Sequence, residues 1–527
     1  MKKTLLSMFA ALAMALPSMA QWSTDFAENN QINPDSTENY GYELQTNNNG
    51  ITYVFMQIPY KGTISMRLQI LDKDGVKLFP DTAKILSAEP NISFTKVNKH
   101  LMIDNDGNAI IAVSDFRSGN EGYTIYKVNE KGDVLWSKSL KGVDASSNVA
   151  GMSMACSEDG GYVFAYEPYE LTTNFGRVQL EKLKADGSDA WDDILRFSDK
   201  SNSLSFPYVV DAGSSQTLLV YAKGSNNDLI ANLIDFDGST VWDEDVPVYR
   251  GGFTSIPVWV QMGVSEAPDN GMFVYWRDAQ DASYENRISY IMNDGTYGFS
   301  TGEEGTIISH DTDNSRDVPN IYYDKDDKAI YFVYRVFNQA SQGYQGIYMQ
   351  KMSLDGELLW GANGKAIVEV QNTDSYSYSS VQDAGDGKIA VFYMRNEGGV
   401  ENGNVDTYMV LFDKDGNKIQ NEVNVSLKKN TKYSVNSSRL IDGEYYLLDW
   451  EEHVKVSLNN IVMQRVFLNG TATGIKNVTD GANGKNIVRT EYFSLGGERL
   501  QAGAKRVSIK RNVYADGTVK TQKVIAR

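Results

Sequence analysis

Cysteine, histidine and long apolar runs are scarce in this chain of 527 residues. Cys156 is the only cysteine, so no disulfide can form within the chain, and its apolar neighbours favour a packed side chain. Only His100, His310 and His453 could serve as an imidazole base for a nucleophile. After residue 20 no stretch approaches the ~20 apolar residues of a membrane span, and none shows extended helical periodicity. These absences exclude a disulfide scaffold, a membrane helix after residue 20 and a helical bundle.

The first twenty residues carry the pattern of a secretory signal peptide. Lys2 and Lys3 precede an apolar run at 4–16, and Ser18-Met19-Ala20 has the small-x-small form of a cleavage site. The mature chain is therefore expected to begin at Gln21 and to be exported. No cysteine follows this site, which argues against a lipoprotein.

Acidic residues outnumber basic ones, and the formal net charge is −18. The charge is unevenly distributed, because residues 474–527 contain eleven Lys and Arg but four Asp and Glu. The rest of the chain is strongly acidic, which disfavours nucleic acid and anionic lipid as partners.

A turn motif recurs along the chain with a near-constant period. In each copy a β-rich run ends in Asp-Gly, Asn-Gly or Lys-Gly, and in most copies an aromatic residue follows four positions later. The eight glycines are Gly75, Gly132, Gly187, Gly238, Gly295, Gly356, Gly416 and Gly470, at intervals of 51 to 61 residues. A second Gly-containing turn precedes most copies by about half a period, as at Asn49-Gly50. Two hairpins per period predict four strands per unit, which is typical of a propeller blade.

The repeat predicts an all-β protein. We expect an eight-bladed (alternatively seven-bladed) β-propeller at 21–473, a linker at 474–484 and a small C-terminal β-domain at 485–527. An array of β-sandwiches is the alternative, although it does not explain one unbroken period. The aromatic residues after the turns are expected to fill the gaps between neighbouring blades. They are Phe79, Trp136, Trp191, Trp242, Phe299 and Trp360.

The spacing of glycine, three variable residues and tryptophan resembles the tryptophan-docking repeat of eight-bladed propellers of the quinoprotein dehydrogenase type. Four of the eight copies carry the tryptophan. The resemblance implies the fold but not the quinone, because the family's quinone-binding signature includes a vicinal disulfide and this chain has one cysteine. The same repeat occurs in a propeller that assists outer-membrane protein assembly, so an envelope assembly scaffold is one hypothesis. No cofactor is expected.

Asp-x-Asp pairs lie at several turns, at 72/74, 104/106, 235/237 and 413/415. These turns also resemble the Asp-box of sialidases, but the serine of that box is missing and the spacing from glycine to tryptophan is one residue longer. A calcium loop needs about six to eight oxygen ligands, and its full pattern is absent. Turn geometry alone favours aspartate at such positions, so no metal is expected.

Ligand binding is expected on the face opposite the Gly-containing turns. Strands alternate in direction, so the connections between second and third strands lie on that face, and these connections are long and varied. Basic residues recur near the end of the second strand, and aromatic residues lie in the same loops. The candidate ligand-binding residues are Arg117, Trp276, Arg277, Arg335, Phe337 and Arg395, with Lys223, Tyr284 and Tyr344 of the same kinds. Converging arginines could hold an acidic sugar; the alternative is ion pairing with the chain's own carboxylates.

The last fifty residues contain Tyr492-x-x-x-Gly496, Lys505-x-Val507-x-Ile509 and Lys523-Val524-Ile525. These features resemble the C-terminal sorting domain of type IX secretion cargo in Bacteroidetes. Arg506 and Ser508 replace the Gly and Tyr of that family's usual Gly-Val-Tyr-Ile strand. The resemblance implies contact with the secretion machinery, then attachment to the cell surface or release. The alternative is a small β-domain that caps the propeller.

No catalytic constellation is visible in the sequence. The chain is therefore expected to be a secreted or cell-surface propeller that binds a macromolecule, glycan or protein, without catalysis. The alternative is a glycan-active hydrolase or lyase, which would place paired carboxylates on the variable-loop face.

Overall fold

The computed structural model describes residues 22–525 except 34–38, 40, 62, 81, 89–99, 116–120, 143–146, 174, 200, 251–261, 279–283, 400–402, 456–457, 474–486, 495–498, 501–506 and 515–518. The predicted signal peptide at 1–20 and the predicted linker at 474–484 lie outside the described residues. In the described residues, regular structure is β-strand, apart from the short 3-10 helices η3 (Pro268–Asn270) and η5 (Gly302–Glu304). In the described part of the chain, no helix combines the length and hydropathy that crossing a membrane requires.

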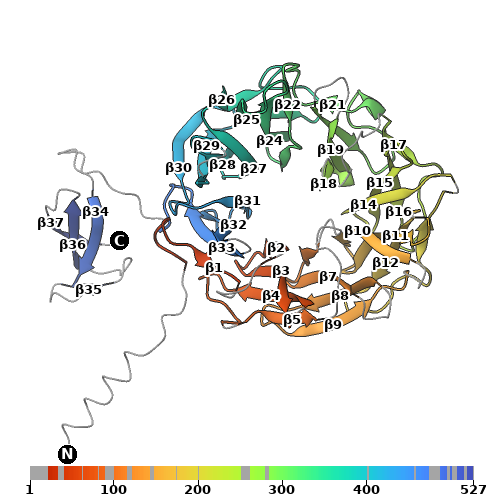
Figure 1. Ribbon diagram of the computed structural model, residues 1–527, viewed down its shortest axis with the longest axis horizontal. Helices are drawn as coiled ribbons and strands as arrows, with labels where there is room; N and C mark the ends of the chain where they lie inside the picture. The colour runs from red at the N-terminus through yellow and green to blue at the C-terminus, as the bar shows by residue number, and fades with distance from the viewer. Residues whose placement is uncertain are drawn as a thin grey trace, which may run out of the picture.

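Antiparallel sheets follow one another around a ring (Figure 1), and we number them 1 to 8 in chain order. Sheet 1 contains β2 (Gly41–Thr46), β3 (Thr52–Tyr60), β4 (Thr63–Leu71) and β5 (Lys84–Ser87). Sheet 2 contains β6 (Leu101–Ile103), β7 (Ala109–Asp115), β8 (Gly122–Val128) and β9 (Val134–Ser139). Sheet 3 contains β10 (Ser147–Cys156), β11 (Tyr162–Glu170), β12 (Val178–Leu183) and β13 (Leu195–Phe197). Sheet 4 contains β14 (Leu204–Asp211), β15 (Thr217–Lys223), β16 (Asp228–Ile234) and β17 (Val246–Tyr249).

The second half of the ring repeats this order, with the first strand innermost in sheets 5, 7 and 8 (Figure 1). Sheet 5 contains β18 (Met262–Glu266), β19 (Met272–Asp278), β20 (Glu285–Ile291) and β21 (Thr306–Ile307). In sheet 6 the first strand is split into β22 (Asn314–Arg316) and β23 (Asn320–Asp324), followed by β24 (Ala329–Asn338), β25 (Gln345–Ser353) and β26 (Lys365–Gln371). Sheet 7 contains β27 (Ser375–Asp383), β28 (Lys388–Asn396), β29 (Val405–Asp413) and β30 (Lys418–Asn424). Sheet 8 contains β31 (Lys432–Ser437), β32 (Tyr445–Lys455), β33 (Leu458–Phe467) and β1 (Asn30–Gln31).

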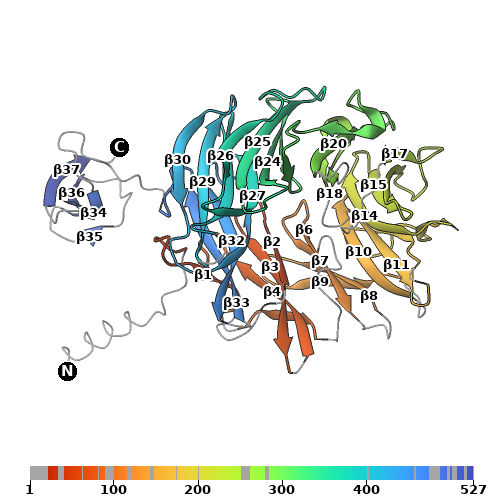
Figure 2. The same cartoon turned by 45° about the horizontal axis from the view of Figure 1, so that its top comes forward.

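The N-terminal segment closes the ring. β1 pairs antiparallel with β33, with Asn30 opposite Met463, and it is the outer strand of sheet 8. Ile32 continues the contact, since its N–H donates to the carbonyl of Ile461 at 2.8 Å. Figures 1 and 2 both show β1 beside β33, so the two ends of the repeat region share one sheet.

The Gly-containing turns occupy the two predicted positions, between first and second strands and between third and fourth strands. All eight glycines of the repeat have φ between 75° and 88°, in the left-handed region that glycine tolerates. The Asn270-Gly271 turn differs, because Asp269 and Asn270 have positive φ and Gly271 is extended. Aspartates stabilise these turns: Asp72 Oδ1 accepts the N–H groups of Asp74 and Val76, each at 2.9 Å. Turn geometry therefore accounts for aspartate at such a position.

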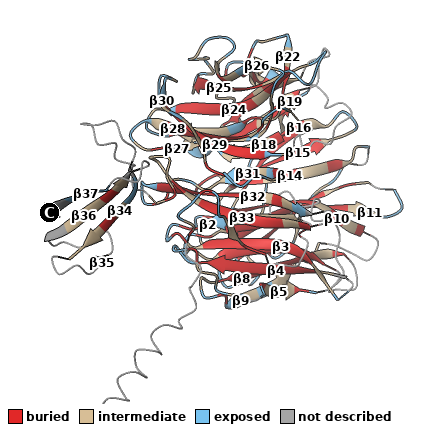
Figure 3. Cartoon of the chain, turned by 60° about the vertical axis from the view of Figure 1, so that its left-hand side comes forward, coloured by how far each residue is buried: buried red, intermediate tan, exposed pale blue. Residues whose placement is uncertain are grey.

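Clusters of buried apolar side chains lie between every two neighbouring sheets of the ring. One of them joins sheet 8 to sheet 1 and includes Leu447 and Ile461 with Val54 and Met56. Figure 3 shows the same distribution, with buried residues along the ring strands. The cores lie between sheets, so each sheet is stabilised by both of its neighbours.

The repeated aromatic residues bridge neighbouring sheets, as the spacing predicts. The indole N–H of Trp136 donates to the carbonyl of Ala185 in sheet 3 at 2.9 Å, and its ring lies against Gly187. A Cβ on Gly187 would meet this ring at 2.6 Å, so only glycine allows the contact. Trp22 makes the corresponding contact between the N-terminal segment and sheet 1, against Gly75. The other aromatic–glycine pairs are Phe79 with Gly132, Trp191 with Gly238, Trp242 with Gly295, Phe299 with Gly356 and Trp360 with Gly416.

A ninth sheet lies at the C-terminus. It contains β34 (Ile487–Phe493), β35 (Arg499–Leu500), β36 (Val507–Tyr514) and β37 (Val519–Ile525), in the order β35-β34-β36-β37. Among the described residues its strands pair only with one another. Gly496, Lys505 and Arg506 of the sorting-domain motifs lie outside the described residues.

Candidate functional site: a polar cavity along the inner strands

Two adjoining cavities, of about 1120 and 990 Å³, lie along the inner strands of the ring. The first is bounded by sheets 1, 2, 7 and 8, and the second by sheets 1 to 5. They share five lining residues, Glu43, Gln45, Met102, Ile103 and Asn105. Residues of the turns between first and second strands also line them, including Asn48 and Glu158. The central cavity, as we call the two together, therefore reaches the Gly-turn face of the ring.

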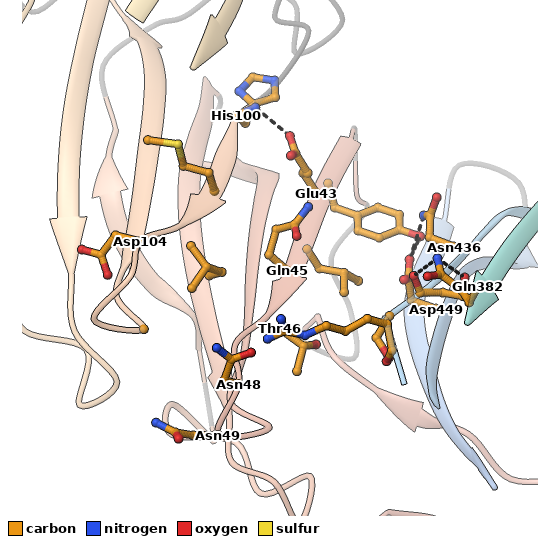
Figure 4. A pocket seen from close by; sticks show the side chains of 18 of the residues that line it. Glu43, Gln45, Thr46, Asn48, Asn49, His100, Asp104, Gln382, Asn436 and Asp449 are labelled. Atoms are coloured by element: carbon orange, nitrogen blue, oxygen red, sulfur yellow. Dashed lines mark hydrogen bonds between the residues drawn. The ribbon is translucent and has the colours of Figure 1, made fainter. Parts of the chain in front are cut away.

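Side-chain amides are the most numerous kind of polar group in the lining of the first cavity (Figure 4). They come from Gln45, Asn48, Asn49, Asn105, Gln382 and Asn436. An amide offers both donors and an acceptor, so a wall of amides can bind a ligand that carries many hydroxyl groups. Gln45 and Asn105 are exposed, and both contribute to the two cavities.

Asp449 on β32 contributes a buried carboxylate to the lining of the first cavity. Its side chain is buried, with a residue exposure of 1%. Oδ1 accepts the hydroxyl of Tyr42 at 2.7 Å and the amide of Asn436 at 3.0 Å (Figure 4). Oδ2 has no hydrogen-bond partner among the described residues. A buried carboxylate oxygen without a donor is costly.

Burial sets the protonation of this carboxyl group. It raises the pKa of Asp449 to about 6, against the opposing effect of the two hydrogen bonds. Burial and the charge of Asp449 also raise the pKa of Tyr42 well above its usual value, so the phenol remains a donor. Asp449 is therefore ionised at neutral pH and becomes protonated in mildly acidic solution.

Glu43 and His100 lie on the other side of β2, where Glu43 Oε2 accepts the backbone N–H of His100 at 2.7 Å (Figure 4). The imidazole is buried, with Nδ1 3.2 Å from the carbonyl oxygen of Ala112 and the ring centroid 5.4 Å from that of Phe55. Through these contacts, His100 packs in the interface between sheets 1 and 2.

Carboxylates from three neighbouring sheets line the second cavity. Glu158, Asp211 and Glu266 lie where the first strands of sheets 3, 4 and 5 reach their turns. Burial, followed by the negative charges of Glu266 and Glu158, raises the pKa of Asp211 to about 6. The nearby Lys182 is engaged with Asp159 at 2.6 Å. The central cavity is thus a region of negative potential.

On the opposite face, the predicted arginines pair with carboxylates of this chain. Arg277 and Arg335 converge on Asp317, at 3.4 and 2.6 Å. Arg277 lies 4.6 Å from the ring centroid of Tyr284, and Arg335 lies 5.1 Å from that of Phe337.

The remaining basic candidates are paired too, since Arg395 contacts Asp374 at 2.9 Å and Lys223 contacts Asp199 at 3.0 Å. Each of these described basic residues thus makes an ion pair of the kind given as the alternative to anion binding. Arg117 lies outside the described residues.

The aromatic candidates differ in exposure. Trp276 is completely buried between sheets 4 and 5, with its ring centroid 4.8 Å from that of Tyr249. Phe337 is 8% exposed, whereas Tyr344 is 43% exposed. Of the three, only Tyr344 presents much of its ring to solvent.

Sequence reasoning missed the cavity residues, because variation among the loops points to the opposite face. A usable signal lies in the first strands, which are polar compared with the second strands: β27 is SYSYSSVQD and β31 is KYSVNS. Asp449 also interrupts the apolar run Tyr445–Leu448. Among the described residues, no group of three or more His, Cys, Asp or Glu side chains is arranged to hold a metal ion.

No family model and no curated protein matches the chain. Solved structures resemble it in fold. An ulvan lyase of polysaccharide lyase family PL25 has 12% identity and a TM-score of 0.44, over 85% of this chain and 96% of that one. The β-propeller domain of the Trilobed protease from Pyrococcus furiosus has 11% identity and a TM-score of 0.38, over 74% and 95%. A protein of unknown function from Dyadobacter fermentans DSM 18053 has 12% identity and a TM-score of 0.37, over 64% and 99%. The ring of antiparallel sheets, with a buried apolar cluster between each sheet and the next, makes this chain a β-propeller.

Proposed function

We propose that this protein is an exported glycan-binding propeller that holds its ligand in the central cavity without transforming it. The observation that carries the proposal is the group of amide side chains that lines the first cavity near the buried carboxylate of Asp449. Among the described residues, Oδ2 of this carboxylate has no hydrogen-bond partner. Sugar hydroxyls are donors and acceptors at once, and they match such a wall. The volume of about 1120 Å³ exceeds what a single sugar ring needs and suits a short oligosaccharide.

A glycan array probed with the purified protein tests this proposal. Gln45→Ala and Asn105→Ala remove exposed amides from the cavity, and Arg277→Ala and Arg335→Ala remove the paired arginines of the opposite face. We expect the two cavity variants to lose binding and the two arginine variants to keep it. Loss confined to the arginine variants would move the site to the variable-loop face. If the wild-type protein binds no glycan on the array, a glycan ligand is rejected.

We further propose that the C-terminal sheet directs the exported chain to the cell surface. The support is the resemblance of Tyr492-x-x-x-Gly496 and Lys523-Val524-Ile525 to type IX sorting motifs, together with the basic composition of this segment. Fractionation of bacteria that possess this secretion system, expressing either the full chain or a chain ending at residue 473, tests the proposal. We expect only the full chain at the surface or in the medium. Equal surface delivery of both chains would leave the C-terminal sheet a structural domain.

A further inference from the structure

We propose that the central cavity selects glycans with free amino groups over neutral and acidic glycans, and that Asp449 binds the amine. This inference deepens the proposed function and rests on it. It concerns the chemical class of the sugar, which the amide wall alone does not specify.

The unsatisfied oxygen of Asp449 is the first observation. Both protein donors, Tyr42 and Asn436, approach Oδ1, and Oδ2 has no partner among the described residues. A sugar hydroxyl would satisfy the hydrogen bond but leave the buried negative charge uncompensated. An ammonium group supplies the hydrogen bond and the opposite charge together, and charge-assisted hydrogen bonds are the stronger kind.

The charge of the surrounding cavity is the second, independent observation. Glu43, Glu158, Asp211 and Glu266 line it, and Arg439 is a lining cation. Two lysines close to these walls are already paired, Lys127 with Asp104 at 2.9 Å and Lys182 with Asp159. The negative charges of the cavity would repel a glycan that carries carboxylates or sulfates, and they would attract an amino sugar.

The test is calorimetric titration of the purified full protein with four oligosaccharides of equal length. They are a glucosamine oligomer, its N-acetylated form, a cello-oligomer and a galacturonate oligomer. Near pH 6.5 we expect the glucosamine oligomer to bind about tenfold more tightly than either neutral oligomer, because a charge-assisted hydrogen bond is about twice as strong as a neutral one. The galacturonate oligomer should bind most weakly, and added salt should reduce the preference for the amine.

Asp449→Asn and Asp355→Asn form a matched pair of variants. Both convert a carboxylate to an amide, but Asp355 is exposed in the β25–β26 turn and does not line the cavity. We expect Asp449→Asn to bind the glucosamine oligomer no more tightly than the neutral oligomers, and Asp355→Asn to keep the preference of the wild type for the amine. Equal binding of the glucosamine and neutral oligomers by the wild type would overturn the inference, and so would preference for the galacturonate oligomer.

Cys156 provides a second readout that needs no substitution. It is the only cysteine of the chain, it is partly exposed, and it lines the second cavity. A ligand in the central cavity should slow its alkylation by a small thiol reagent. Protection by all oligosaccharides alike would support the proposed function and overturn the charge preference. Protection by none of them, but by a lysine-rich peptide, would overturn the proposed function itself.

Discussion

At the scale of single residues, buried ionisable groups connect stability to pH in this protein. Asp449 is buried and its pKa is about 6, whereas an aspartate in an unfolded chain titrates near 3.9. Between these two values the native protein holds a proton that the unfolded chain releases. The contribution of this group therefore becomes unfavourable as pH rises from about 4 to about 6, and it stays unfavourable above that range.

Asp449→Asn should remove this cost. We expect the variant to be more stable than the wild type by about 2–3 kcal/mol at pH 7, and nearly equal to it at pH 4. Urea unfolding from pH 4 to pH 8 measures the difference, with Asp355→Asn as a control that changes an exposed carboxylate. A stability difference that is constant across this range would contradict the pKa shift.

At the scale of elements, the contact between a tryptophan and the turn of the next sheet is the repeated unit of assembly. Trp191 illustrates it, because its indole N–H donates to the carbonyl of Phe236 at 2.8 Å while its ring lies against Gly238. The turn needs glycine for two reasons. Its φ is +88°, and a Cβ would lie 2.9 Å from the indole ring.

A double-mutant cycle separates these two reasons. Trp191→Ala should cost about 3–5 kcal/mol, and Gly238→Ala should cost more than the ~1–2 kcal/mol of left-handed strain alone. In the Trp191→Ala background, Gly238→Ala should cost only the strain, because the clashing ring is gone. Denaturant unfolding gives all four stabilities.

Gly387→Ala is the control for this cycle, since Gly387 has φ of +70° and a methyl group added there would meet open space. It should cost about as much as the strain alone. Additive effects of Trp191→Ala and Gly238→Ala would show that the ring and the turn do not depend on each other.

At the scale of the whole molecule, the ring is closed by the N-terminal segment. Trp22 is 3% exposed, and its indole N–H donates to the carbonyl of Lys73 at 2.8 Å, while β1 covers the edge of β33. These contacts join the first part of the repeat region to the last, so they act on a loop of several hundred residues. Without these contacts, the edge of β33 is uncovered and sheet 1 lacks the aromatic contact that Trp22 provides.

Trp22→Ala should therefore destabilise the protein by about 3–5 kcal/mol and make the N-terminal segment sensitive to protease. Thermal unfolding and limited proteolysis measure the two effects. Trp136→Ala removes a bridge within the ring, and it should lower stability without exposing the N-terminal segment. Equal proteolysis of wild type and Trp22→Ala would show that β1 holds the segment without the tryptophan.

The sequence by itself determined the all-β class, the four-stranded repeat and the inter-sheet role of the aromatic residues. These follow from local chemistry: positive φ selects glycine, alternating apolar runs form strands, and constant spacing places each aromatic residue against the next turn. Trp22 was not anticipated, because it precedes the strand it serves and belongs to no complete copy of the motif.

Only the tertiary structure decided where polar groups meet. Asn436 and Asp449 are cross-strand neighbours within sheet 8, but Tyr42 reaches Asp449 only because sheet 8 closes against sheet 1, and some 400 residues separate Tyr42 from the other two. Arg277 and Arg335 were singled out from sequence, but Asp317, which pairs with both, comes from the split first strand of sheet 6. Local sequence patterns indicate the backbone conformation and the burial of each residue. The net charge of a site, and the hydrogen bonds that its polar atoms make, depend instead on contacts between segments that are distant in the chain. For this reason the repeat specified the ring, and the closed ring determined which carboxylates remain for a ligand.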